Sequence, residues 1–388
     1  MRYSVLIIFT FVFLSSCMST YNTANVQTAG NAISSQYDSI RAVADNYSEK
    51  IEIKYAKGLN VDYREDGIHV SLSSIQGENE QDDRKTEKNL TYEFVIKPGK
   101  HNRFICTTAL QLGNFEVLGM EDKIVGINSL KNIFSERIQK QIADGKTEKV
   151  GKEGVFDIEK VIALKPDYIF VSASKYGGFE ALKECGIPLI PHHGYKETSP
   201  LGQAEWIKLV GLLTGETKRA NAVFDHVEKE YLTLKEKVQK LKDGKVKLPT
   251  VLSGRQLRDG WYVMGGKSYM AQLFADAGAQ YIMSDIEGTG GTTLDFESVY
   301  ARGINADYWQ IDGSFDADYT LDALATEDAR YADIKAYKEQ KVIFCNLTLT
   351  PYRELAGVSP HLMLADFVKA FHPELLPSYK PKFYDFIK

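Results

Sequence analysis

The spacing of hydrophobic positions changes partway along the chain. In the first part Ile68, Val70 and Leu72 alternate with polar neighbours and a second apolar run covers 92–96, so residues 51–97 are predicted to form β-strands. Beyond them, short apolar runs alternate with longer segments of helical spacing. The pattern predicts strands at 103–106, 124–127, 168–171, 188–190, 250–252, 306–311 and 342–346, and helices at 109–118, 268–277 and 359–371. This alternation predicts an α/β fold with mostly parallel sheets and helices on both faces.

Between the two α/β halves lies a segment with almost no helix breaker. Gly211 and Gly215 are the only helix breakers in residues 203–241. The apolar residues of this segment recur at helical spacing. The stretch 213–217 has the residues of a helix end followed by a new helix start. The second helix, 217–241, would be about 37 Å long at about 1.5 Å per residue. We therefore expect two similar lobes joined by a single long α-helix.

The two halves share a repeated motif. D-I-E-K-V-I-A begins at Asp157 and D-F-E-S-V-Y-A begins at Asp295, and each is followed by D-Y and an apolar strand. Each Asp can cap a helix whose second residue is the Glu, and both acids then complement the helix dipole. A Glu at the same offset in both halves also fits a paired surface role for Glu159 and Glu297.

The N-terminus has the pattern of a lipoprotein signal. Residues 4–14 form an apolar stretch too short to span a bilayer as a helix, and they end in Leu-Ser-Ser-Cys at 14–17. This sequence resembles the lipobox of bacterial lipoproteins, so residues 1–17 are predicted to direct cleavage before Cys17 and acylation of that cysteine. An ordinary signal peptide with a chance cysteine is the alternative. Residues 18–50, poor in large apolar side chains, are expected to form a flexible tether.

Composition narrows the function classes. The chain of 388 residues has 47 basic and 52 acidic side chains, a net charge of −5 that argues against nucleic-acid binding. Besides Cys17 it has Cys106, Cys185 and Cys345, an odd number with no C-x-x-C pair, which indicates neither a zinc site nor a redox pair. One disulfide bond between two of these three cysteines is the alternative that the sequence leaves undecided. The chain also lacks G-x-S-x-G, H-E-x-x-H and a phosphate-binding loop, so we predict no enzyme.

Several stretches, in order and spacing, resemble one known family. They lie at 109–127, 150–171, 211–216 and 261–278, with I-A-L-K-P-D at 162–167 and G-L-L-T-G-E at 211–216. The chain is similar here to the periplasmic binding proteins that serve ABC importers of iron complexes, heme and cobalamin. The resemblance runs from 102 to 376 and leaves out the β-rich part. It divides the chain into a β-rich extension at 51–100, a first lobe at 101–200, a helical linker at 201–245 and a second lobe at 246–388.

The resemblance implies a function and partners. It implies that the cargo lies in a cleft between the lobes, and that Glu159 and Glu297 dock onto arginines of the permease of an ABC importer with its ATPase. It implies a membrane-anchored monomer on the periplasmic or other extracytoplasmic face. No cofactor is expected, because the metal would belong to the cargo. A ferric siderophore is the first expectation, and heme or cobalamin are the alternatives.

Ligand contacts are expected from loops at the carboxyl ends of the strands. The candidates are Thr107, Thr108, Lys175, Tyr176 and His193 on the first lobe, and Trp261, Tyr262 and Arg353 on the second. The aromatic rings would stack on a large planar ligand, Arg353 would pair with a carboxylate or catecholate, and Lys175 would add a point charge. Each has a plainer alternative, since Trp261 can belong to the core and Arg353 can be solvated.

Two further hypotheses concern metal binding and redox chemistry. His192 and His193 could bind heme iron, but neighbouring residues at a strand end point in opposite directions, so only one could face a cleft. A bare metal ion needs about three converging His or carboxylate ligands, and the position after the first strand is Thr107. The architecture also resembles cluster-binding redox subunits of the nitrogenase type, which the scattered cysteines and the lipobox disfavour.

Overall fold

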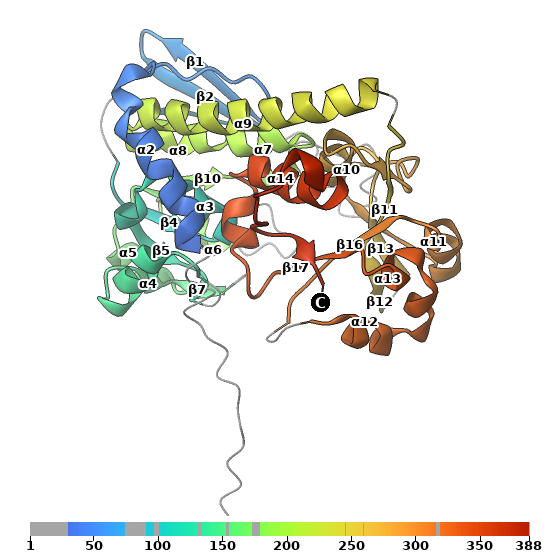
Figure 1. Ribbon diagram of the computed structural model, residues 1–388. Helices are drawn as coiled ribbons and strands as arrows, with labels where there is room; N and C mark the ends of the chain where they lie inside the picture. The colour runs from blue at the N-terminus through green and yellow to red at the C-terminus, as the bar shows by residue number, and fades with distance from the viewer. Residues whose placement is uncertain are drawn as a thin grey trace, which may run out of the picture.

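The computed structural model describes residues 30–73, 91–96, 101–130, 133–152, 155–172, 179–244, 246–258, 260–315 and 319–387. Cys17, with the rest of the predicted signal, and the candidates Lys175 and Tyr176 lie outside these ranges. The described chain forms two α/β lobes beneath one long helix, α9 (Figure 1). None of its helices is both long and apolar enough to cross a membrane.

The first lobe is built on a fully parallel sheet. Its strands are ordered β10 (Leu189–Pro191), β9 (Tyr168–Val171), β4 (Phe104–Cys106), β5 (Ile124–Ile127) and β6 (Glu148–Lys149). Helices α3 (Ala109–Leu118), α4 (Glu136–Ala143), α5 (Ile158–Ala163) and α6 (Glu180–Lys183) connect them, with a short hairpin of β7 (Gly151–Lys152) and β8 (Val155–Phe156). The central strands are buried, as their continuous apolar runs predict.

The second lobe repeats this plan with one antiparallel edge. Its sheet is ordered β14 (Gln280–Tyr281), β11 (Thr250–Ser253), β16 (Tyr308–Gly313), β17 (Val342–Asn346) and β18 (Asp385–Phe386), and only β18 is antiparallel. A small antiparallel sheet joins β12 (Arg255–Leu257), β13 (Gly260–Met264) and β15 (Gly291–Leu294). The helices are α10 (Tyr269–Asp276), α11 (Phe296–Gly303), α12 (Leu321–Glu327), α13 (Lys335–Lys338) and α14 (Pro360–Phe371). The predicted α/β class with mostly parallel sheets is confirmed.

The linker is built from consecutive helices, and the long helix predicted at 217–241 is present. It consists of α7 (Pro200–Glu205), α8 (Ile207–Thr214) and α9 (Thr217–Asp243). Gly215 ends α8 with a φ of 72°, and a Cβ on Gly211 would overlap Ala220, so α8 and α9 pack very closely. The 27 residues of α9 span about 40 Å at about 1.5 Å per residue.

The β-rich extension forms a three-stranded antiparallel sheet of β1 (Leu59–Arg64), β2 (Gly67–Ser73) and β3 (Thr91–Ile96). The loop before β1 is held by two buried carboxylates, one on α7 of the linker and one just before it. Glu205 accepts the backbone N–H of Lys54, Tyr55 and Ala56 at 2.7–3.0 Å. Glu197 accepts the N–H groups of residues 57 and 58 at 2.9–3.0 Å. The extension is therefore held on the body of the protein by specific buried contacts.

The expectation of a flexible tether over 18–50 is wrong for its second half. Residues 30–46, which we call the N-terminal strap, are mostly helical and include η1 (Ser35–Tyr37), α2 (Asp38–Ala42) and η2 (Ala44–Asn46). Tyr37 is 1% exposed, and its hydroxyl lies 2.7 Å from Ser359 Oγ at the start of α14. A few buried apolar residues fix the strap, although its overall composition resembles that of a linker.

The lobes also touch directly beneath the linker. A Cβ on Gly113 of α3 would overlap the backbone oxygen of Glu354 in the short helix η6 (Tyr352–Ala356), so only glycine allows this approach. Glu116 of α3 and Glu354 of η6 are both buried, and burial raises the pKa of both carboxyls. The junction therefore joins α3 of the first lobe to η6 of the second.

Candidate functional site

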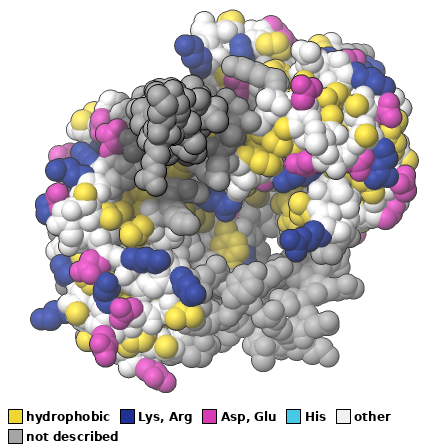
Figure 2. Space-filling model, turned by 90° about the horizontal axis from the view of Figure 1, so that it is seen from below, with side chains coloured by type: hydrophobic (Ala, Val, Ile, Leu, Met, Phe, Trp, Pro, Cys, Tyr) yellow, Lys and Arg dark blue, Asp and Glu magenta, His cyan; other side chains and the backbone are white. Residues whose placement is uncertain are grey.

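The carboxyl ends of both parallel sheets define the candidate site. Ligands of open α/β sheets bind outside these ends, where the connecting loops gather. Seen from the side opposite α9, the described surface shows a hollow between the two lobes, with hydrophobic side chains inside it (Figure 2). The groups that follow the strand ends decide what this hollow can bind.

On the first lobe, polar atoms without hydrogen-bond partners follow three strands of the sheet. Among the described side chains, Thr107 Oγ1 after β4, Asn128 Oδ1 after β5 and His193 Nδ1 after β10 are buried and unpaired. A buried polar atom left unpaired costs about 1–3 kcal/mol, so such atoms are usually satisfied by water or a ligand. Because the strands are parallel, the three groups lie along the same edge of the sheet.

Thr108 serves mainly to start α3. The Oε1 atom of Gln111 accepts the N–H groups of Thr107 at 2.7 Å and Thr108 at 3.1 Å, which fixes the turn between β4 and the helix. The Thr108 side chain is half-buried at this turn. Its position after β4 is as predicted, and its contact with a ligand stays a prediction.

Both histidines of the predicted pair are buried. The rings of His192 and His193 lie 4.9 and 6.3 Å from the ring of Trp206, and the two side chains are 2% and 6% exposed. Burial lowers the pKa of His192 to about 3 and that of His193 to about 4, so both are neutral at physiological pH. The expectation that one of them faces an open cleft is not met, and His193 keeps only its unpaired Nδ1 atom for a ligand.

On the second lobe, a carboxylate and a guanidinium share the end of β16. Asp312 accepts a hydrogen bond from Gln310 Nε2 at 3.3 Å, and Arg353 Nη2 lies 3.4 Å from Ser314 Oγ. The Asp312 side chain is exposed to solvent, yet desolvation by the surrounding protein raises the pKa of its carboxyl. Nearby arginines lower this pKa, but their effect is smaller. Both properties together are typical of a group inside a hollow. Arg353 is exposed, as predicted for a ligand contact.

Trp261 and Tyr262 occupy opposite faces of β13. Tyr262 is 41% exposed, whereas Trp261 has no exposed surface and its ring packs against Trp309 and Tyr331. Its Nε1–H donates to the backbone oxygen of Ser253 at 3.2 Å. Side chains alternate across a strand, so only one of two neighbours can face solvent. The expected cleft exposure of Trp261 is therefore wrong, and its ring belongs to the core.

Sequence reasoning missed several groups of this site. Asp312 and Ser314 flank the end of β16, Asn128 follows β5, and the hydroxyl of Tyr269 lies 2.7 Å from that of Tyr352, which follows the strand predicted at 342–346. The signal that could have found the first three is their place directly at the end of a predicted parallel strand. The tyrosine pair joins α10 to η6 and could not be seen without the fold.

The repeated motif forms the same helix start in both lobes, as predicted. Asp157 accepts the N–H of Lys160 at 3.0 Å, and Asp295 accepts that of Ser298 at 2.8 Å. Glu159 and Glu297 are the second residues of α5 and α11, and both are exposed. Within the described part of the chain Glu159 has no ion-pair partner.

Glu297, by contrast, is already paired. It forms an ion pair with Arg330 at 2.8 Å, and Arg330 also pairs with Asp328 and lies 3.4 Å above the ring of Phe296. Exposed pairs of this kind contribute about 0–1 kcal/mol, so Glu297 remains open to another cation.

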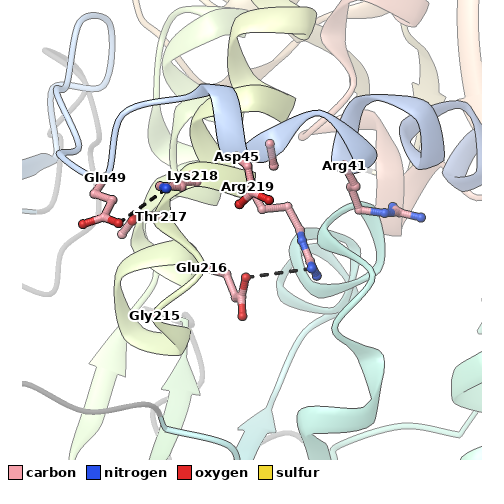
Figure 3. A pocket seen from close by; sticks show the side chains of 9 residues that line it. Arg41, Asp45, Glu49, Gly215, Glu216, Thr217, Lys218 and Arg219 are labelled. Carbon is pink, nitrogen blue, oxygen red and sulfur yellow. Dashed lines mark ion pairs between the residues drawn. The ribbon is translucent and has the colours of Figure 1, made fainter.

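A separate polar cavity of about 500 Å³ lies where the strap meets the start of α9 (Figure 3). Its cations already have partners, since Arg41 donates to the Val117 oxygen at 2.7 Å and Arg219 to the Leu118 oxygen at 3.0 Å. Lys218 pairs with Glu49 at 3.5 Å. These contacts cap the end of α3 and hold the strap, so the cavity has a structural role.

The described residues contain no cluster of three or more His, Cys, Asp or Glu side chains able to hold a metal ion. Cys106, Cys185 and Cys345 are free thiols, and the first and last of them are buried. The described residues therefore provide no cysteine set for an iron–sulfur cluster.

Two lobes that offer polar groups to a shared hollow, joined by a single helix, define a two-lobed ligand-binding protein. Residues 105–347 match the family described as periplasmic binding protein, and the chain belongs to that family. The resemblance predicted from the sequence is confirmed. The family and fold are those of substrate-binding proteins rather than enzymes.

Two lipoproteins of Methanocaldococcus jannaschii are similar to this chain in sequence. An uncharacterized lipoprotein of Methanocaldococcus jannaschii is 27% identical over 297 residues, which cover 73% of this chain and 68% of that protein. A second uncharacterized lipoprotein of the same organism is 26% identical over 65% of this chain, and the match spans 64% of the relative, less than two thirds of its length.

Solved structures share the fold at lower identity. A periplasmic heme-binding protein from Pseudomonas aeruginosa has a TM-score of 0.56 and 18% identity, covering 74% of this chain and 98% of that one. A protein of an ABC-type Fe³⁺-hydroxamate transport system from Saccharomonospora viridis has a TM-score of 0.54 and 14% identity, covering 74% and 96%. A molybdate-binding protein from Haemophilus influenzae has a TM-score of 0.56 and 16% identity, covering 74% and 90%.

Proposed function

We propose that this protein captures an iron complex, a ferric siderophore in the first place, in the hollow between its lobes and delivers it to the permease of an ABC importer. The observation that carries the proposal is the arrangement of unpaired polar groups at the strand ends of the first lobe, together with Asp312 and Arg353 on the second. These groups would satisfy their hydrogen bonds on a polar ligand held between the lobes.

The chemistry of the described groups favours an intact chelate over a bare ion. Thr107 offers a hydroxyl and Arg353 a guanidinium, and both can donate to the hydroxamate, catecholate or carboxylate oxygens of a siderophore. The amide oxygen of Asn128 can accept from an N–H or O–H group of the organic part of the ligand. Tyr262 adds an exposed ring for contact with the organic part of the ligand. Neighbours in fold named for heme and for Fe³⁺-hydroxamate support an iron complex. Heme is the second candidate on the same ground.

The anchor and the docking surface complete the proposal. Acyl chains on Cys17 would hold the protein at the extracytoplasmic face of a membrane, which the naming of its relatives as lipoproteins supports. Glu159 and Glu297, exposed at equivalent positions on the two lobes, would dock onto cationic side chains of the permease. One acid on each lobe lets a dimeric permease contact both lobes at once.

The cargo is tested by titrating the purified protein with a ferric hydroxamate, a ferric catecholate, hemin and cyanocobalamin in a calorimeter. One iron complex should bind at a single site, and Arg353→Ala and Thr107→Val should each weaken it about 10-fold or more, the equivalent of about 1.4 kcal/mol for one lost hydrogen bond to a charged or polar ligand. Arg64→Ala is the matched control, because Arg64 is an exposed arginine of β1 that pairs with Asp62 at 2.7 Å. Binding of none of the four would sink the proposal.

Docking is tested by charge reversal in cells that take up the cargo through this protein. Glu159→Lys and Glu297→Lys should each reduce uptake while the purified variants keep the cargo affinity of the wild type. Glu236→Lys is the control, since Glu236 is an exposed acid of α9 that pairs with Lys240 at 2.9 Å. Normal uptake by both lobe variants would show that these acids serve only their helices.

A further inference from the structure

The N-terminal strap begins at the edge of the first lobe that faces the hollow. A Cβ on Gly30 would lie 2.9 Å from Phe134 Cβ, and Asn31 Oδ1 accepts the N–H of Glu136 at 3.5 Å. Phe134 follows the carboxyl end of β5, and its N–H donates to the Glu354 carboxylate of η6 at 3.1 Å. The first described residue therefore lies at the carboxyl edge of the sheet, where the two lobes meet.

The strap ends on the opposite edge. Arg41 donates to the oxygen of Val117 at the end of α3, and a helix that connects two parallel strands runs antiparallel to them. Farther along, Asn221 of α9 donates to the oxygen of Ser48 at 2.8 Å. The strap thus crosses the first lobe from the hollow to α9, and Figure 1 shows it in dark blue between the upper and lower sides of that lobe.

The strap is firmly held along this path. Ile33 and Tyr37 are each 1% exposed. The Tyr37 ring meets the rings of His226 on α9 and His361 on α14 edge-on, at 6.1 and 6.4 Å between centroids. One buried side chain thus contacts both the linker and the second lobe. The point at which the chain enters the folded body is therefore fixed.

The exposed acids of both lobes lie toward the same edge. Helices α5 and α11 lead into the amino ends of β9 and β16, so their own first turns lie toward the carboxyl edges of the sheets. Glu159 and Glu297 stand in these first turns. The entry of the chain, the hollow and the two acids consequently share one side of the molecule, and α9 lies on the other.

We infer that the strap turns the anchored protein so that its hollow and its two exposed acids face the lipid surface. This inference rests on the proposed acylation of Cys17. Only the 12 residues 18–29 then separate the anchor from the strap, which limits the reach to about 43 Å at about 3.6 Å per residue. If all of 18–50 were free, the reach would be about 119 Å and no side would be favoured.

The test measures which side of the anchored protein lies nearer to lipid. The full chain, acylated in a bacterial host, is reconstituted into phosphatidylethanolamine–phosphatidylglycerol vesicles that contain an acceptor-labelled lipid. A donor dye is attached through a noncanonical residue at Val155 or at Leu232. Both are exposed aliphatic residues, the first beside the start of α5 and the second on α9. We expect higher energy transfer from Val155 than from Leu232.

A tether variant serves as the matched control. A flexible insertion of Gly and Ser residues between residues 29 and 30 should reduce the ratio of the two transfer efficiencies toward one, while leaving cargo affinity unchanged. Vesicle-bound protein with equal transfer at both positions, or with more transfer at Leu232, overturns the inference and leaves the anchor standing. Protein that stays in the supernatant overturns the proposed anchor and the inference together.

Discussion

Removal of the Glu205 carboxylate should loosen the β-rich extension and destabilise the whole fold. Glu205 has no exposed surface, and besides three backbone N–H groups it binds Lys208 Nζ at 2.8 Å. Lys208 is itself buried, and its Nζ also donates to the oxygen of Glu52 at 2.7 Å. In Glu205→Ala this cation would stay buried without the carboxylate that it contacts.

The expected cost follows from that buried charge. Removing one partner of a buried ion pair costs about 3–5 kcal/mol, and the freed backbone N–H groups near the surface can recover water. We therefore expect a loss of about 4 kcal/mol, which would lower the melting temperature by on the order of 10 °C. In Glu205→Ala with Lys208→Met, where the cation is also absent, a large part of that loss should be recovered.

The assay combines thermal unfolding with hydrogen exchange of the segment that includes residues 54–58. The matched control is Glu228→Ala, because Glu228 also holds this segment, through Lys54 Nζ at 3.1 Å and the Tyr55 hydroxyl at 2.6 Å, but from a partly exposed position. That variant should lose only about 1 kcal/mol. If Glu205→Ala were no less stable than Glu228→Ala, the reasoning from the buried charge would be refuted.

Two further predictions concern titratable groups. Burial raises the pKa of Glu354 to about 8, so the folded state retains a proton that the unfolded chain releases near the ordinary glutamate pKa of about 4.5. The stabilisation of the fold by this proton is complete below pH 4.5 and is lost as the pH rises through 8. In Glu354→Gln the urea concentration at the midpoint of unfolding should therefore change less between pH 5 and pH 8 than it does in the wild type. A thiol reagent should label Cys185 in the native protein and reach Cys106 and Cys345 only after unfolding, because those two are buried; equal labelling of all three in the native state would contradict this.

The spacing of apolar residues was sufficient to predict the α/β lobes, the long helix α9 and the capped repeats at Asp157 and Asp295. These features depend on local signals: periodicity, helix caps and glycine stops. The sequence does not predict the strap, because its polar composition hides the few residues, such as Tyr37, that fix it through contacts with distant parts of the chain.

The candidate site was only partly predictable for a similar reason. The position of a strand end can be read from the sequence, which led to Thr107 and Arg353. The face of β13 that each side chain occupies depends on how the small antiparallel sheet packs, and this buries Trp261 and exposes Tyr262. Asp312 is recognisable as a candidate site residue only from the position of β16 beside the hollow.

The most direct test of the central claim is a crystal structure of the protein with the iron complex that binds most tightly in the titrations. We expect one complex between the lobes, within hydrogen-bond distance of Thr107 Oγ1 on the first lobe and the Arg353 guanidinium on the second. A complex bound elsewhere, for example in the cavity between the strap and α9, would contradict the account, as would one that touches only a single lobe.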